Sequence, residues 1–302
     1  MRATVTVRVP GSTSNVGSGF DCVGVAVDRW LRVTARRAPG AAGIERRGTL
    51  QALDTPLARD LLYRGFTAAC DRAGQQVPRD IAFLADSGIP VARGLGSSAA
   101  ALVAGAVAAT TLLSLQLDRA AIASLCAELE GHPDNVAPMV HGGATLAVST
   151  PDGLAVSPLV VHPSLALVFA IPDFSIETKR ARAVLPTTLP FSQAVQAAAR
   201  SAALVQGLAH GDRRLLAAGL DDVLHVPFRR SLVVGYDAVT SAARSAGAFG
   251  ATLSGSGPTL VAIAPIDRSD AVAAAMARAW RECGVVAEGF CVTRPAGGYE
   301  TD

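Results

Sequence analysis

Apolar and polar positions along the chain recur with the periods typical of strands and helices. Val5, Val7 and Val9 alternate with polar residues, which predicts a half-buried strand ending at Pro10–Gly11. The same reasoning predicts further strands over Cys22–Val27, Leu31–Arg36, Ile44–Arg46, Ile81–Ala85, Gly142–Ser149, Ala166–Ile171, Ala251–Leu253, Leu260–Ala264 and Val285–Val292. Helical spacing predicts helices over Leu57–Arg72, from the Gly94–Ser98 loop to about Leu115, from Asp118 to Glu130, and over Glu177–Val184, Phe191–Leu208, Arg213–Leu216, Gly235–Ala246 and Ser269–Cys283.

This order of elements indicates an α+β protein with a largely antiparallel sheet. The pattern restarts with a strand beyond Pro163, so we expect a domain boundary near residues 155–165. We therefore expect an N-terminal domain over residues 1–160 and a C-terminal domain over residues 161–302, a size that suits two ordinary domains.

One apolar segment, Gly94–Leu117, invites comparison with a membrane span. Its purely apolar part, Ala99–Ala109, is too short to cross a bilayer. A helix buried on nearly all sides fits better. The whole chain is 50% hydrophobic, 17% charged and 5% aromatic, which is typical of a soluble protein with a core of Ala, Val and Leu.

Charge and cysteine content exclude several classes of protein. A formal net charge of +2 is too small to favour nucleic-acid binding. The five cysteines include no Cys-x-x-Cys pair, so we expect neither a disulfide framework nor a zinc site, and a reducing, cytoplasmic compartment. Met1–Pro10 lacks the apolar core of a signal peptide. Lys179 is the single lysine, so a phosphate site would have to use backbone amides, hydroxyls or arginine.

The strongest local motif runs from Pro90 to Ala100 and reads Pro-Val-Ala-Arg-Gly-Leu-Gly-Ser-Ser-Ala-Ala. A glycine-rich turn that enters a helix exposes unpaired amides, and the helix dipole favours an anion there. Ser97 and Ser98 add hydroxyls, one of which suits Mg²⁺. The alternative is a glycine C-cap followed by a serine N-cap, and this motif alone does not decide between the two.

Three other polar segments stand out. Ala251–Thr259 reads as small residues between two strands, which is also the composition of a plain hairpin. Glu128–Pro138 gathers acid, His, Asp and Asn on a turn after a helix and could bind a metal or a polar substrate, or simply form the turn. Pro10–Asp21 is dense in hydroxyl, amide and carboxylate groups, with a flexible solvated loop as the alternative.

Taken in order, these segments resemble the superfamily of galactokinase, homoserine kinase, mevalonate kinase and phosphomevalonate kinase, and within it the homoserine kinases. Pro10–Asp21, Gly94–Ala100 and Ser254–Thr259 match the three superfamily motifs, while Glu130–Pro138 is similar to the homoserine branch. The resemblance implies a ribosomal-protein-like N-terminal domain, a ferredoxin-like C-terminal domain and a site between them. It also implies ATP and Mg²⁺ as cofactors, L-homoserine as substrate, and neither nucleic acid nor membrane as partner; a homodimer is possible.

The resemblance further implies roles for particular residues. Mg²⁺ would be held by Ser98 and Glu130, with Glu128 as the alternative acid. ATP would be bound by Pro90, Arg93, Gly94, Leu95, Gly96, Ser97, Ser98, Ser254, Gly255, Ser256 and Gly257. Homoserine would be contacted by Asn15, Asp21, His132, Asn135, Arg182 and Arg229, with Arg230 as a rival of Arg229. Asp21 suits the ammonium group, and the two arginines suit the carboxylate.

The resemblance also indicates how catalysis would proceed. Mevalonate kinases carry an Asp as base where this chain has Asn135, and an amide cannot accept a proton at neutral pH. We therefore expect Ser98, Glu130 and Asn135 to act by alignment and electrostatics, with the hydroxyl proton passing to a phosphate oxygen. Asp134 is expected to be a structural partner more than a base. Asp60 stands where the family usually has an Asn near the adenine, and Val234 replaces a Pro.

Overall fold

Within residues 3–40 and 42–302, which the computed structural model describes, the chain forms two β-sheets with helices packed on them. The first sheet has the order β11-β1-β2-β4-β3, and β5 and β6 extend it beside β2. Its strands are β1 (Thr4–Asn15), β2 (Gly19–Arg37), β3 (Gly43–Gly48), β4 (Ile81–Ser87), β5 (Ala144–Thr150), β6 (Gly153–Leu159) and β11 (Glu300–Thr301). Neighbouring strands are antiparallel except β3 and β4, which run parallel.

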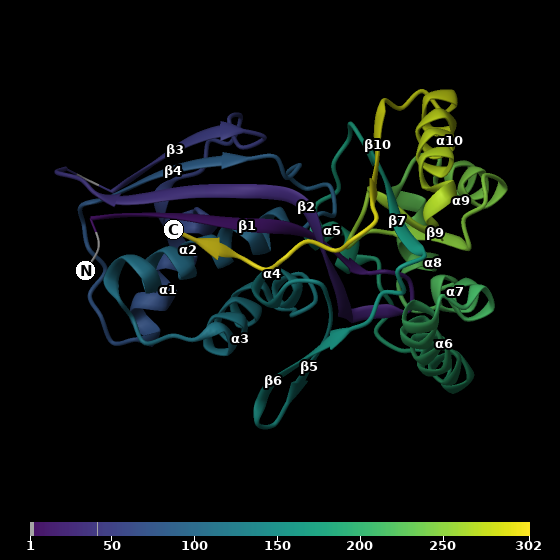
Figure 1. Cartoon of the computed structure of the whole chain (residues 1–302), viewed down its shortest axis with the longest axis horizontal. Helices are drawn as coiled ribbons and strands as arrows, with labels where there is room; N and C mark the ends of the chain where they lie inside the picture. Colours follow the sequence, from purple (N-terminus) through teal and green to yellow (C-terminus); the bar gives the residue numbers. More distant parts are fainter. Residues whose placement is uncertain (1–2, 41) are drawn as a thin grey trace.

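Four helices lie against one side of the first sheet, below it in Figure 1. They are α1 (Leu61–Arg72), α2 (Ser97–Leu113), α3 (Arg119–Glu130) and α4 (Val136–His141), with the short 3₁₀ turn η1 (Leu57–Arg59) before α1. The α2 helix is buried on most sides by Ala, Val and Leu side chains. No helix in the described part of the chain is long and apolar enough to span a membrane.

The second sheet has the antiparallel order β10-β7-β9-β8. Its strands are β7 (Leu165–Pro172), β8 (Gly250–Leu253), β9 (Leu260–Pro265) and β10 (Ala287–Val292). The helices of this half are α5 (Thr178–Ala183), α6 (Phe191–His210), α7 (Arg213–Leu220), α8 (Val226–Arg229), α9 (Tyr236–Ser245) and α10 (Ser269–Glu282), with 3₁₀ turns η2 (Arg230–Leu232) and η3 (Ile266–Arg268). The fully buried Trp280 anchors α10 in the second core, which α9 and α10 share with the sheet.

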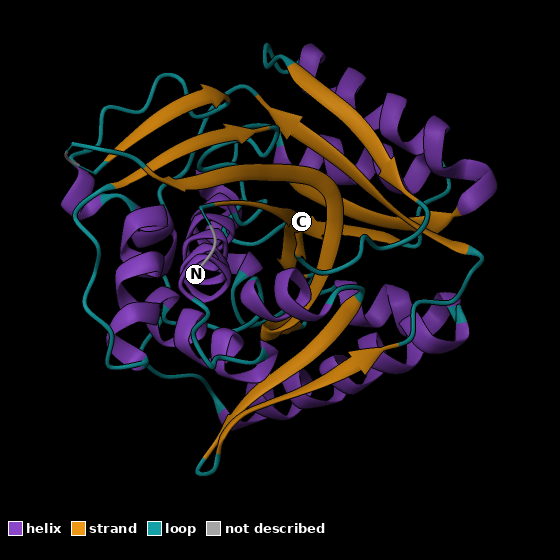
Figure 2. Ribbon diagram, turned by 60° about the vertical axis from the view of Figure 1, so that its left-hand side comes forward, coloured by secondary structure: helices purple, strands orange, loops and turns teal. Residues whose placement is uncertain are grey.

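The two halves share buried contacts. The core under the first sheet continues into Phe169, Ile171 and Val261 of the second sheet. A third cluster joins Val16 of the first half to Leu204 and Leu216 of α6 and α7. Figure 2, coloured by secondary structure, shows the strands of both halves within one body. The site described below lies where these halves meet.

The α+β prediction is confirmed, and most predicted elements are present within a few residues. Four short helices and strands, α4, α8, β6 and β11, were not predicted. The predicted stop at Pro10–Gly11 is wrong, because β1 continues to Asn15 through a register shift. Cys22–Val27 and Leu31–Arg36 are parts of one strand, β2. The predicted division at residue 160 stays a prediction; β11, at the end of the chain, pairs with β1 of the first half.

The first strand was predicted to end at Pro10–Gly11, and a flexible solvated loop was one alternative for Pro10–Asp21. Instead Ser12, Thr13 and Ser14 lie within β1 and are almost completely buried. Buried hydroxyls need hydrogen-bond partners, and these serines and this threonine find them in the site. Burial of this polar strand end was therefore decided by the site's hydrogen bonds rather than by the hydrophobic pattern.

Candidate active site

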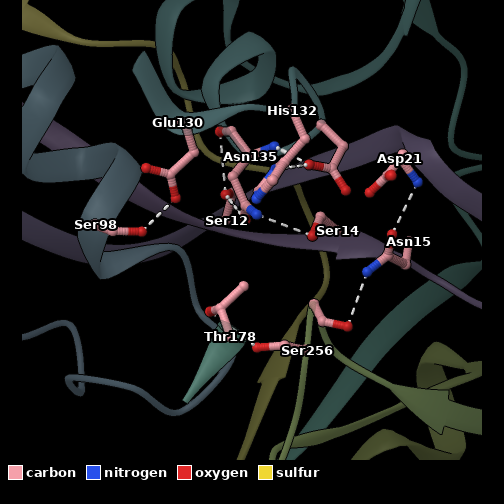
Figure 3. A network of polar contacts seen from close by, with 12 residues as sticks. Ser12, Ser14, Asn15, Asp21, Ser98, Glu130, His132, Asn135, Thr178 and Ser256 are labelled. Carbon is pink, nitrogen blue, oxygen red and sulfur yellow. Dashed lines mark hydrogen bonds and ion pairs between the residues drawn. The ribbon is translucent and has the colours of Figure 1, made fainter. Parts of the chain in front are cut away.

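A cavity of about 500 Å³ opens between the two halves of the molecule. Part of its lining is apolar and comes mainly from β3, the segment after it and α1; we call this the apolar wall (Leu31, Ile44, Leu50, Leu53, Leu61 and Leu62). A second part carries opposite charges and is called the ionic wall (Asp21, Arg182 and Arg229). Between them lie the Gly94–Ser98 loop and the turn from Glu130 to Asn135, which Figure 3 shows converging on one space.

The Gly94–Ser98 loop has the geometry of an anion site. Gly94 and Gly96 both have left-handed backbone, with φ of 76° and 70°. A side chain at Gly94 would come 2.1 Å from the Ser254 carbonyl oxygen, and one at Gly96 would come 2.9 Å from Asn135 Oδ1. Gly96 is the N-cap of α2, and no side chain caps the first turn. The serine N-cap alternative is therefore wrong, and the first amides of α2 are available to an anion.

The loop around Ser254 supports the Gly94–Ser98 loop from behind. Ser254 is completely buried; its hydroxyl donates to the Gly94 carbonyl oxygen at 2.7 Å and contacts the Thr13 hydroxyl at 2.9 Å. Gly255 and Ser256 do line the cavity, and Ser256 Oγ lies 3.4 Å from Thr178 Oγ1 of α5. This contact joins two segments of the second half that both line the cavity.

Five residues expected to bind the nucleotide do not line this cavity: Pro90, Arg93, Leu95, Ser254 and Gly257. Leu95 is fully buried, and its carbonyl oxygen accepts from the Ser12 amide. The Arg93 guanidinium donates to the Pro172 carbonyl oxygen and, with Pro90, lines a separate open hollow. These side chains position the loop rather than face its contents, because the alternating directions of successive residues send them behind the turn.

Ser98 and Glu130 meet inside the cavity. The Ser98 hydroxyl donates to Glu130 Oε1, and both residues line the cavity (Figure 3). Glu130 is the last residue of α3, so its side chain leaves the helix beside the start of α2. Glu128 instead pairs with Arg72 at 2.6 Å on an exposed surface. The carboxylate that accompanies Ser98 is therefore that of Glu130.

Asn135 is held in one orientation by two serines of β1. Its amide nitrogen donates to Ser14 Oγ at 3.0 Å, and its amide oxygen accepts from Ser12 Oγ at 2.8 Å (Figure 3). Because a neutral amide has no proton-accepting pair of usable basicity, this orientation serves hydrogen bonding. The side chain lines the cavity directly against Gly96.

His132 and Asp134 form a pair in the cavity wall. His132 Nδ1 lies 2.7 Å from Asp134 Oδ1, and the same oxygen accepts a hydrogen bond from the backbone amide of Asn135. Asp134 is only 1% exposed. Burial lowers the pKa of His132, but the hydrogen bond and charge of Asp134 outweigh burial, so the net pKa is raised. Asp134 thus organises the turn, as expected.

Asp21 and Arg182 neutralise each other across the cavity. The Arg182 guanidinium donates to both oxygens of Asp21, at 2.8 and 3.2 Å. Asn15 fixes the carboxylate's position, since its side-chain oxygen accepts from the Asp21 amide at 2.9 Å and its nitrogen donates to the Gly255 carbonyl oxygen at 2.8 Å. Asn15 and Asp21 both have left-handed backbone, which Asn and Asp tolerate better than other side chains.

Arg229, rather than Arg230, lines the cavity. Arg229 is 2% exposed, and burial together with the nearby charge of Arg182 lowers its pKa to about 10. Arg230 is exposed and pairs with Asp237 at 3.2 Å. Two residues that touch Arg229, Phe20 and His225, were not predicted. Their only signal in the sequence was their position, since Phe20 directly precedes Asp21 and His225 lies four residues before Arg229.

The apolar wall carries one ion pair. Arg46 Nη2 lies 2.7 Å from Asp60 Oδ2, and both side chains are mostly buried. The other oxygen of Asp60 accepts from the Leu62 amide and caps α1. An apolar surface with a polar pair beside it suits a ring system with polar edges.

Comparison with known proteins agrees with this geometry. Residues 60–143 match the model described as the GHMP kinases N-terminal domain, and residues 204–285 match that of the GHMP kinases C-terminal domain. The solved structure of homoserine kinase from Cytophaga hutchinsonii has a TM-score of 0.89 and 29% identity, covering 100% of this chain and 98% of that one. Leishmania major mevalonate kinase in complex with R-mevalonate has the same fold, with a TM-score of 0.70, 17% identity and 96% coverage of each chain.

Curated relatives are more similar in sequence. Homoserine kinase of Trichormus variabilis is 41% identical over 286 residues, 94% of each chain. That of Synechococcus sp. is 43% identical over 284 residues, 93% of this chain and 92% of the relative. The chain belongs to the GHMP kinases and, within them, to the homoserine kinase family.

Proposed function

We propose that this chain transfers the γ-phosphate of ATP to the side-chain hydroxyl of L-homoserine, giving O-phospho-L-homoserine for threonine biosynthesis. The observation that carries the proposal is the ionic wall, which lies in the same cavity as the Gly94–Ser98 loop. One carboxylate and two guanidiniums match the ammonium and carboxylate of an amino acid. The homoserine kinase relatives supply the identity of that amino acid.

The nucleotide would lie along the apolar wall and the Gly94–Ser98 loop. The base has an apolar surface there, and the triphosphate has the first amides of α2 together with Ser97 and Ser98. With no lysine in the loop, charge neutralisation falls to the helix dipole, the hydroxyls and a metal ion. The Arg46–Asp60 pair stands beside the base in place of the Asn that the family usually carries.

The donor set of Ser98 and Glu130 fits Mg²⁺, because both offer the hard oxygen ligands that this ion prefers. The described residues contain no group of three or more His, Cys, Asp or Glu side chains suited to a metal, so these two oxygens would be complemented by phosphate oxygens and water. When bound, Mg²⁺ would neutralise charge on the transferring phosphate.

The chain's own residues would act by alignment. Asp21, Arg182 and Arg229 would orient homoserine, while Asn135, locked by Ser12 and Ser14, would hydrogen-bond the substrate beside the phosphate loop. Each nearby carboxylate already has a partner: Asp21 has Arg182, Asp134 has His132, and Glu130 has Ser98. The hydroxyl proton would therefore pass to an oxygen of the transferring phosphate.

A coupled ADP-release assay over homoserine, threonine, serine and mevalonate tests the proposal. We expect homoserine to give the highest kcat/KM. Turnover of another substrate while homoserine fails would refute it. ATP binding without turnover of any amino alcohol would instead indicate a nucleotide-binding protein that kept the fold.

We also propose that the protein works in the cytoplasm, which suits its free cysteines at Cys22, Cys70, Cys126, Cys283 and Cys291. A homodimer stays a prediction. Light scattering of the purified protein would decide between a monomer of 30.8 kDa and a dimer of twice that mass.

A further inference from the structure

Arg229 is a buried cation that depends on neighbouring groups for its orientation. Its Nε donates to the Ala181 carbonyl oxygen at 2.9 Å, and its Nη1 lies 3.3 Å from His225 Nδ1. A guanidinium has five N–H donors, and a buried one must have its donors directed at acceptors. These two contacts engage Nε and Nη1, which leaves Nη2 for the cavity that Arg229 lines.

The partners of His225 determine which of its ring nitrogens carries the proton. Arg229 can only donate, so His225 Nδ1 must accept. Nε2 lies 3.1 Å from the Gly17 carbonyl oxygen, which can only accept, so Nε2 must donate. The ring is completely buried. The surroundings therefore select the neutral tautomer with the proton on Nε2, the one form that accepts from Arg229.

Several charges act on His225. Burial lowers its pKa and Arg229 does the same, while Asp222, at 3.7 Å from Nε2, and Asp21 oppose them. The net direction is downward, which keeps the ring neutral. Asp222 is itself occupied, because its carboxylate accepts from the amides of Leu224, His225 and Val226.

Phe20 completes the arrangement. Its ring stacks on His225 with centroids 4.9 Å apart and an interplanar angle of 19°. The guanidinium carbons of Arg229 and Arg182 lie 5.2 and 5.9 Å from the centre of the same ring. One aromatic ring thus contacts both cations of the ionic wall, a favourable placement for positive charge. Phe20 also directly precedes Asp21 in β2.

We propose that His225, backed by Phe20, is a positioning residue that aims the Arg229 guanidinium at the carboxylate of the amino-acid substrate. The inference rests on the proposed function, since it assumes an amino-acid substrate in this cavity. His225 hydrogen-bonds Arg229 and lies outside the cavity lining, so it acts through Arg229 rather than by touching the substrate.

The test replaces His225 by Leu, which keeps apolar volume and removes the acceptor. We expect KM for homoserine to rise about tenfold to hundredfold, because a hydrogen bond to a charged group is lost. KM for ATP and kcat should change by less than about threefold, the sign of a lost binding contact. His210→Leu, at the exposed end of α6, is the matched control. It should leave KM for homoserine, KM for ATP and kcat unchanged.

Two inhibitors separate positioning from general damage to the fold. L-2-Aminobutyrate keeps the carboxylate of homoserine, whereas 3-aminopropan-1-ol lacks it. In His225→Leu, the Ki of the first should rise with KM for homoserine, and the Ki of the second should stay unchanged. Equal increases for both would overturn the proposal, as would an equal increase in KM for ATP.

Two further variants keep the test decisive if His225→Leu folds poorly. His225→Asn retains an oxygen near the Nδ1 position and should recover most of the affinity for homoserine. In an Arg229→Met background, His225→Leu should not raise KM for homoserine any further, because the residue acts through Arg229. Failure of the wild-type enzyme with homoserine would refute the proposed function. Normal wild-type activity together with an unaltered KM for homoserine in both His225→Leu and His225→Asn would refute this inference alone.

Discussion

The two charged regions of the cavity are built in different ways. The Gly94–Ser98 loop offers an anion the backbone amides at the start of α2, and this arrangement needs only a turn that enters a helix. The ionic wall uses side chains from distant parts of the chain: Asp21 and Arg182 are 161 residues apart, and Arg229 comes from yet another helix. The first device is local in sequence, while the second exists only after the halves have packed.

This difference has a functional consequence. No substitution other than proline removes a backbone amide, so other changes at the phosphate loop should act through the loop's shape or its metal ligands. The ionic wall consists of side chains with individual partners, so single substitutions there should affect the amino acid and spare the nucleotide. The predictions below follow this division, from the largest expected effect to the smallest.

Glu130→Gln tests the metal side of the phosphate loop. Loss of the carboxylate beside Ser98 should lower kcat by about 10²- to 10³-fold and raise the Mg²⁺ concentration needed for half-maximal rate. Steady-state rates measured over a Mg²⁺ titration check this. Glu128→Gln, two residues away but paired with Arg72 on the surface, should behave like wild type. The reverse result would make Glu128 the metal ligand.

Arg182→Ala tests the ionic wall. The expected result is an increase of about a hundredfold in KM for homoserine, with KM for ATP altered by less than about threefold, because a bidentate carboxylate contact is removed. Arg180→Ala, on the exposed side of the same helix, is the control. Equal increases in KM for homoserine and KM for ATP would contradict the assignment of the ionic wall to the amino acid alone.

Ser254→Ala tests whether the second half of the chain holds the phosphate loop. The variant loses the hydrogen bond from the buried hydroxyl to the Gly94 carbonyl oxygen, at a cost of about 1–3 kcal/mol in the free energy of unfolding. We expect KM for ATP to rise by about tenfold at most, and KM for homoserine to change less. Ser256→Ala is the matched control for the free energy of unfolding, measured by urea denaturation; a similar loss there would contradict the role of Ser254.

The pairing of His132 with Asp134 should make the stability of the protein depend on pH. The pKa of His132 is raised in the folded state, so its pairing with Asp134 stabilises the protein fully at pH values below the unfolded-state pKa of 6.5. This contribution is lost as the pH rises through the folded-state pKa of His132. Asp134→Asn should therefore cost more stability at about pH 5.5 than at about pH 8.5. NMR titration should show the pKa of His132 falling in the variant, since burial and the charge of Arg182 are then opposed only by the charge of Glu130; an unchanged pKa would contradict this account.

Much of the fold was predictable from the sequence because its elements follow local rules. Asp118 caps α3 by accepting from the Ala121 amide, the usual role of an Asp directly before a helix. Pro151 and Asp152 form the turn between β5 and β6, where Thr150 pairs with Gly153. The errors fall where tertiary contacts override the local pattern. Polar Ser12 and Ser14 were not expected to be buried, and they are buried because Asn135 supplies their hydrogen bonds.

The sequence alone determined the helix-entering glycine turn, the absence of a lysine from it and the family to which its motifs belong. These properties depend on residues that are neighbours along the chain. Only the tertiary structure decided that Glu130 rather than Glu128 meets Ser98, and that Arg229 rather than Arg230 lines the cavity. It also decided that Phe20 and His225 contact Arg229. Those outcomes depend on which side of an element is buried and what packs there, and long-range packing sets both.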